Sequence, residues 1–81
     1  MKANVYVTLK TGLLDAQGNT IRSALESLGF KGIANVRVGK LIEVDLNHYP
    51  STEKAKQDVE RMCQKLLANP VVEQYRIEIV R

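Results

Sequence analysis

Two kinds of apolar spacing take turns along this chain, and their order constrains the fold more than any other feature. Apolar and polar residues alternate singly over Ala3–Lys10, which is the period of a strand with one buried face. A helical spacing of apolar residues follows, between Asp15, a suitable N-cap, and Gly29, a suitable left-handed C-cap. The first third of the chain therefore predicts a strand and then an amphipathic helix.

The middle of the chain predicts a hairpin. Val36–Val38 alternates apolar and polar residues, Gly39-Lys40 interrupts the alternation, and it resumes over Ile42–Leu46. Two short strands that meet at a glycine are typical of an antiparallel hairpin.

A second helix and a last strand follow. Ser51 or Thr52 can cap the helix, and Glu53 lies in its first turn, where the helix dipole favours an acidic residue. Asn69-Pro70 ends the helix, and single alternation returns over Tyr75–Ile79. The apolar stripe of this helix consists of Ala55, Val59, Met62, Cys63, Leu66 and Leu67.

This order of elements predicts an α+β fold. Strand, helix, strand, strand, helix, strand is the split βαββαβ arrangement of ferredoxin-like domains, a four-stranded antiparallel sheet with two helices on one face. We expect one domain over residues 1–81, because a chain of this length holds a single core. The side chains expected to face the helices are Val5, Val7, Leu9, Ile42, Val44, Ile77 and Ile79. The other face carries a mixed set that is typical of protein interfaces, namely Tyr6, Thr8, Lys10, Arg37, Leu41, Glu43, Gln74, Arg76 and Glu78.

Size and charge narrow the classes of function. A chain of 81 residues buries a small core, so we expect self-association to support it. The net charge of +3 comes from scattered residues, so no nucleic-acid partner is expected. No apolar run approaches the roughly 18 residues of a membrane span, so we expect no membrane partner and a cytoplasmic location.

Few residues of this chain are of a type and in a position that would indicate catalysis or ligand binding. We interpret His48 as a solvated loop residue and Cys63 as a small buried apolar residue. Glu43 and Asp45 share one strand face, where solvated carboxylates are the commoner outcome. Gly18 in the first turn of a helix is unusual, and both a late helix start and a partner contact stay open. The sequence lacks the stacking aromatics of RNA-recognition domains and the CxxC pair of metallochaperones, whereas a metabolite-sensing module stays open.

Four segments of the chain resemble the PurS family, the small accessory subunits of phosphoribosylformylglycinamidine (FGAM) synthase. The segments are Val5–Lys10, Leu14–Gly18, Val36–Lys40 and Leu66–Glu73. Thr11 and Ala16 depart from the family, which commonly has proline at both positions. These departures loosen a turn and a helix start and leave the resemblance intact.

The resemblance implies a non-catalytic role in a three-component ligase of purine biosynthesis. It implies a homodimer or homotetramer that bridges a large PurL-type synthetase and a PurQ-type glutaminase and assists ammonia transfer. It also implies that this chain binds no cofactor, because ATP and Mg²⁺ are used by the synthetase. The alternative is a metabolite-sensing regulatory dimer of ferredoxin-like, ACT-like fold.

Matching the family segments residue by residue gives a set of expected partner contacts. These residues lie at the ends of strands and in the turns between elements. They are Lys10, Asp15, Gln17, Gly18, Arg37, Gly39, Lys40, Asn69 and Glu73.

Overall fold

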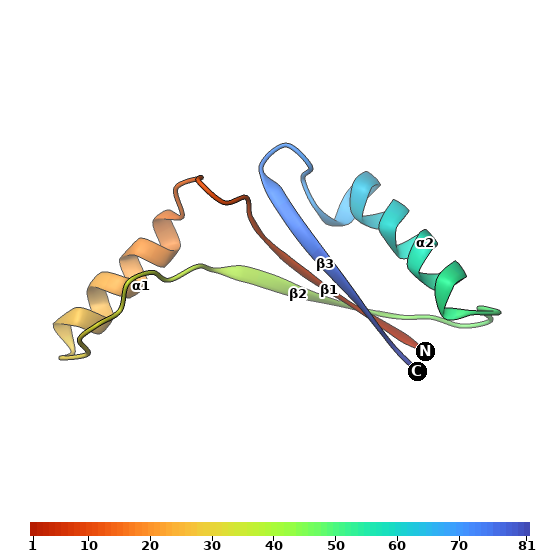
Figure 1. Ribbon diagram of the computed structural model, residues 1–81, viewed down its shortest axis with the longest axis horizontal. Coiled ribbons are helices and arrows are strands. Elements are labelled where there is room, and N and C mark those ends of the chain that lie inside the picture. The colour runs from red at the N-terminus through yellow and green to blue at the C-terminus, as the bar shows by residue number, and fades with distance from the viewer.

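The computed structural model describes all of residues 1–81, with three strands and two α-helices. Strands β1 (Lys2–Leu9), β2 (Gly39–Asp45) and β3 (Glu73–Val80) form one antiparallel sheet in the order β2-β1-β3 (Figure 1). Helix α1 (Ala16–Ser27) follows β1, and helix α2 (Thr52–Met62) follows β2. The α+β class and the antiparallel sheet predicted from the sequence are therefore confirmed.

The core lies between one face of the sheet and α2. Ala3, Val5 and Val7 point from β1 into this layer and are almost fully buried, as the single alternation of β1 predicts. Ala55 and Val59 of α2 meet them from the other side. Half-buried residues pack around this centre, among them Ile42, Val44, Ile77 and Ile79, whereas Leu9 lies outside the cluster.

The predicted helix ends are confirmed at the caps. The side chain of Asp15 accepts a hydrogen bond from the Gly18 N–H, and that of Ser51 accepts one from the Lys54 N–H. Gly29 has a φ of +98°, the left-handed conformation expected after the end of α1. Local capping chemistry therefore fixes where both helices begin.

The predicted hairpin is wrong, and the sheet has three strands where the sequence predicts four. Gly39 is part of β2 and pairs with Thr8 of β1. Its φ is not positive, so it does not supply the left-handed turn that a two-residue hairpin requires. A Cβ at Gly39 would lie 2.5 Å from the Val7 carbonyl oxygen, so this glycine permits close approach of two strands. Residues 36–38 lead into β2 without reversing direction.

The predicted placement of both helices on one sheet face is also wrong for α1. Figure 1 shows α1 projecting beyond the end of the sheet, while α2 lies over it. The molecule is 51 Å long, and its radius of gyration of 16.2 Å exceeds the about 12 Å expected of a compact chain of this length. Without the hairpin turn, the connection to β2 cannot bring α1 back over the sheet of its own chain.

The apolar stripe of α2 is confirmed except at its end. Cys63–Leu67 forms a π-helical turn, in which the Ala68 N–H donates to the Cys63 carbonyl. This wider turn rotates the following residues relative to an α-helix. Leu66, predicted to be buried, is consequently 83% exposed.

Candidate functional site

The residues predicted to contact a partner gather at one end of the sheet, where β1 ends and where β2 and β3 begin. The strand register causes this, because Thr8 lies opposite Gly39 and Leu9 lies opposite Glu73. Lys10 extends the ladder by donating its N–H to the Val72 carbonyl. Segments far apart in the sequence thus form one continuous surface.

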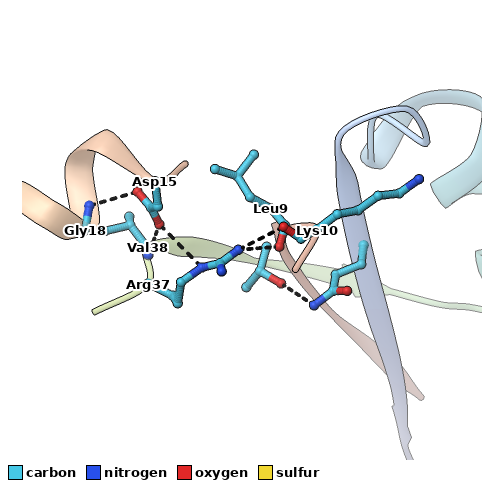
Figure 2. A network of polar contacts seen from close by, with 8 residues as sticks. Leu9, Lys10, Asp15, Gly18, Arg37 and Val38 are labelled. Atoms are coloured by element: carbon cyan, nitrogen blue, oxygen red, sulfur yellow. Dashed lines mark hydrogen bonds and ion pairs between the residues drawn. The ribbon is translucent and has the colours of Figure 1, made fainter. Parts of the chain in front are cut away.

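The carboxylate of Asp15 organises this end of the molecule. Its Oδ1 accepts the Gly18 N–H at 2.8 Å, and its Oδ2 accepts the Val38 N–H at 2.7 Å (Figure 2). These two hydrogen bonds, the one from Val38 foremost, lower the pKa of Asp15, although its burial works in the opposite direction. The buried carboxylate therefore stays ionised and ties the start of α1 to the start of β2.

Arg37 joins the same group of residues to the end of β1. Its Nη2 donates to the Leu9 carbonyl at 2.6 Å and to the Lys10 carbonyl at 3.3 Å, and its Nε lies 3.9 Å from Asp15 Oδ2 (Figure 2). Arg37 is one of the partner contacts expected from the sequence, and in the structure its guanidinium forms hydrogen bonds within the chain, while its role in partner contact stays a prediction. We call this network the latch, formed by Leu9, Lys10, Asp15, Gly18, Arg37 and Val38.

Gly18 is required by close packing within the chain. It is buried in the first turn of α1, so the helix does not start late. A Cβ at this position would collide with the carbonyl oxygen of Val36. Only glycine lets the connection to β2 pass this close to α1. The intramolecular contact explains the glycine, and a partner contact at Gly18 stays a prediction.

A shallow hollow of about 230 Å³ lies beside the latch. It is lined by residues from the ends of all three strands and by one residue of α1. These are Val7, Thr8, Leu9, Gln17, Val38, Gly39, Lys40 and Glu73. Four of the predicted contact residues, Gln17, Gly39, Lys40 and Glu73, therefore share one surface next to the latch.

Asn69 lies in the turn that precedes β3, and Glu73 is the first residue of that strand. The Glu73 carboxylate accepts the Asn69 N–H at 2.7 Å, and the Asn69 side-chain oxygen accepts the Val71 N–H at 3.0 Å. The Ala68 backbone is extended, so the helix has ended before Asn69. Both polar side chains thus shape the turn, and their role in partner contact stays a prediction.

The other reactive residue types lie away from this surface. Cys63 is fully buried, as predicted, and burial raises the pKa of its thiol. His48 is exposed in a loop, as predicted. Glu43 is exposed on the sheet and lies 3.6 Å from the Lys2 amine. Nowhere do three His, Cys, Asp or Glu side chains gather closely enough to hold a metal ion.

Two features were missed by reasoning from the sequence. The latch uses backbone groups of Leu9, Lys10 and Val38, which carry no signal in residue type. A second, larger hollow of about 550 Å³ lies between β2 and the end of α2. We call it the seat, lined by Val44, Asp58, Arg61, Met62, Lys65, Leu66 and Leu67. The sequence identifies its apolar residues but predicts that they lie in a filled core.

No helix in the structure combines the length and apolar character needed to cross a membrane.

In a comparison with known protein families, residues 2–81 match the family model PurS, described as phosphoribosylformylglycinamidine (FGAM) synthase. Among individual proteins, the chain is 44% identical to the FGAM synthase subunit PurS of Methanocaldococcus jannaschii over 78 residues. That alignment covers 96% of this chain and 93% of the relative.

Solved structures agree with the sequence comparison. The crystal structure of M. jannaschii PurS, one of the subunits of formylglycinamide ribonucleotide amidotransferase, superposes with a TM-score of 0.86 and covers 95% of this chain and 92% of that one. A chain of the PurLQS structure from Thermotoga maritima superposes with a TM-score of 0.76 at 31% identity. It covers 95% of this chain and 93% of that one.

Proposed function

Because this chain belongs to the PurS family of FGAM synthase subunits, we propose that it is the small subunit of that ligase in purine biosynthesis. The observation that carries the proposal is the extent of the match, which runs over residues 2–81 and covers 93% of the M. jannaschii subunit. The metabolite-sensing dimer finds no support in these relatives, which are subunits of a ligase.

The partners in this proposal are a PurL-type synthetase and a PurQ-type glutaminase, the combination named for the T. maritima PurLQS structure. The synthetase uses ATP to activate an amide oxygen of its substrate, and the glutaminase releases ammonia from glutamine. The small subunit bridges the two and helps ammonia to pass between them. A protected passage favours the reaction, because ammonia released into water is protonated to ammonium, which is not a nucleophile.

The chain contributes no reacting group of its own in this proposal. Its single thiol, Cys63, is buried with a raised pKa, which keeps it in the unreactive protonated form. Its single imidazole, His48, lies on an exposed loop away from the latch end of the sheet. ATP and Mg²⁺ belong to the synthetase subunit, and the assembly works in the cytoplasm.

The surface beside the latch supports the choice of contact residues. Asp15, Gly18 and Arg37 are engaged within the chain and hold the surface in shape. Lys10, Gln17 and Lys40 are exposed, and Figure 2 shows the Lys10 side chain pointing away from the latch. We therefore assign direct contact with a partner subunit to these three side chains and a positioning role to the latch.

Reconstitution tests this function. The chain is combined with the synthetase and the glutaminase of the same organism, and FGAM formation is followed with glutamine and, separately, with ammonium salts. Glutamine-dependent formation should require the chain, whereas ammonium-dependent formation by the synthetase should depend on it much less. Equal glutamine-dependent rates with and without the chain would refute the proposal.

A matched pair of charge reversals tests the surface. Lys10→Glu together with Lys40→Glu should weaken coassembly with the other two subunits, measured by their retention on the immobilised chain. Lys56→Glu is the control, since Lys56 is also an exposed lysine and lies on α2, away from the latch. Equal retention of both variants would remove the latch end from the interface.

A further inference from the structure

The proposed function leaves one surface of the sheet unused, the face that points away from α2. This face is formed by the even-numbered residues of β1 and β3 and the odd-numbered residues of β2, and we call it the open face. Its residues on the two outer strands are all exposed, and those on the central strand are half-buried. Neither helix of the chain therefore shields these side chains from water or from another molecule.

The charges of the open face are segregated along the strands. The half nearer the latch contains Arg76, and the same side of β1 continues to Lys10, with no acidic side chain between the two. The other half contains three acidic residues and one lysine, which lies 3.6 Å from one of them. They are Glu43, Asp45, Glu78 and Lys2. The half nearer the latch is therefore positive, and the other half is negative.

Arg76 is positioned to bind a carboxylate from outside the chain. Its guanidinium carbon lies 4.2 Å from the centroid of the Tyr6 ring, which is a cation–π contact between neighbouring strands. The carboxylate of Glu78, the nearest acid on β3, instead accepts hydrogen bonds from the Asn4 amide at 3.1 Å and the Tyr6 hydroxyl at 3.4 Å. No ion pair within the chain includes Arg76. A stacked guanidinium with free N–H groups suits bidentate binding of a carboxylate.

The surroundings of Arg76 have the composition of a protein interface. A hollow of about 420 Å³ lies beside the stacked pair. It is lined by Tyr6, Thr8, Gln74, Tyr75 and Arg76. Leu41 lies opposite Tyr6 on the other neighbouring strand and is 50% exposed. Tyrosine and arginine are enriched among the residues that contribute most to protein binding, so this row is suited to be the centre of a contact.

The size of the open face indicates that it is part of a larger contact. Three strands of seven or eight residues present a face of roughly 400 Å². One partner contributes about 800 Å² to a stable protein interface, so this face alone is too small to hold a second molecule, a second copy of the chain included. Lys10 joins the open face to the surface beside the latch, which the proposed function assigns to a partner subunit. The two surfaces together form one continuous contact area.

We propose that the partner subunit that contacts Lys10 also covers the open face and places a carboxylate on Arg76. The contacting segment of that subunit lies along the strands, with acidic side chains over the half nearer the latch. A basic side chain of the same segment faces Glu43 and Glu78 on the other half. This inference rests on the proposed function, because that function supplies the occupant. It adds the chemistry by which the occupant is recognised.

Retention of the separate synthetase and glutaminase on the immobilised chain tests the proposal. The variant with Lys10→Glu and Lys40→Glu identifies the subunit that binds beside the latch. Arg76→Glu should weaken the binding of that same subunit by at least about tenfold in Kd and leave the binding of the other unchanged. Lys56→Glu is the matched control, because it is also a charge reversal at an exposed site but lies on α2, across the sheet from the open face. It should change neither Kd.

Two milder variants keep the test valid if the charge reversal disturbs the sheet. Arg76→Lys keeps the positive charge and loses the planar fork of N–H groups, so it should weaken binding less than Arg76→Glu does. Arg76→Gln removes the charge alone. Its binding should depend less steeply on salt concentration than that of the natural chain, because one screened ion pair is missing. Equal salt dependence of the two would contradict the carboxylate contact.

The outcomes separate this inference from the function on which it rests. Binding that is unchanged by Arg76→Glu, or that falls for the subunit unaffected at Lys10 and Lys40, would overturn the inference and leave the proposed function standing. A change in the oligomeric state of the isolated Arg76→Glu chain would assign the open face to a second copy and would also overturn it. A natural chain that retains neither subunit would overturn the proposed function, and this inference with it.

Discussion

The sheet with α2, which we call the body, and residues 10–38, which we call the arm, are stabilised in different ways. The body buries Val5, Val7 and Val59 almost completely against one another. The arm buries one polar side chain, Asp15, and leaves Ile21 and Leu28 exposed. Apolar packing holds the body together, whereas hydrogen bonds of the latch hold the arm in place.

The two regions differ in how strictly their interactions depend on direction. Apolar burial is not directional, so the body is a scaffold that tolerates small shifts. Hydrogen bonds depend on direction, so the latch sets the angle at which the arm leaves the sheet. The latch therefore fixes the orientation of a helix whose apolar side chains the rest of the chain leaves exposed.

The largest effect on the global free energy of unfolding should come from a substitution in the body. Val59→Ala removes two methyl groups from a fully buried position and should lower the free energy of unfolding by about 2 kcal/mol. Denaturant titration followed by circular dichroism measures it. Val71→Ala, at a 77% exposed site, should change that free energy by less than about 0.5 kcal/mol. Equal effects would mean that this layer is not the core.

Gly18→Ala should act on the arm and spare the body. The added methyl group collides with the Val36 carbonyl, and overpacking of this kind costs about 1–3 kcal/mol. Amide hydrogen exchange should become faster in α1 and at Val38 and stay unchanged in β1. Gln17→Ala is the control at the neighbouring exposed position. Unchanged exchange in α1 would contradict the close approach described here.

Arg37→Ala sharpens the comparison further. It removes the hydrogen bonds to the Leu9 and Lys10 carbonyls and should destabilise the arm by about 1 kcal/mol, since the guanidinium is partly exposed. Exchange of the α1 amides measures the loss. Lys40→Ala, at a residue of β2 whose side chain forms no hydrogen bond or ion pair within the chain, should leave exchange unchanged. A larger effect from Lys40 would contradict the latch.

The smallest effect concerns pH. The pKa of Asp15 is lower in the folded chain than its ordinary value of 3.8. Its stabilisation of the arm is therefore complete above pH 3.8 and is lost as the pH falls through the lower, folded pKa. Protection of the Val38 amide should fall over this acidic range in the natural chain, and Asp15→Asn should flatten that dependence.

Asp58→Asn serves as the control for the pH experiment. Asp58 also has a lowered pKa, caused first by the hydrogen bond from Tyr49, but it lies on α2. Its substitution should leave the pH dependence of Val38 protection intact. The account fails if Asp58 controls that protection and Asp15 does not.

Much of the body could be predicted from the sequence because its determinants are local. Single alternation identifies the inward residues of β1, and Asp15, Ser51 and Gly29 mark helix ends through their own side chains or backbone freedom. The π-helical turn that exposes Leu66 has no comparable signal in residue type.

The hairpin could not be predicted correctly for a different reason. Glycine at position 39 is compatible both with a turn and with close approach of two strands, and only the pairing with Thr8 decides between them. The placement of α1 depends on that choice. Residue matching did select positions that converge at one end of the sheet, but it could not separate the latch from the exposed side chains around it.

The most direct test of the account is amide hydrogen exchange of the Asp15→Ala variant at neutral pH. Loss of the two hydrogen bonds to the Asp15 carboxylate should lower the protection of the Val38 amide and of the α1 amides, and it should leave the β1 and α2 amides protected. Val38 and α1 amides as well protected as in the natural chain would contradict the account.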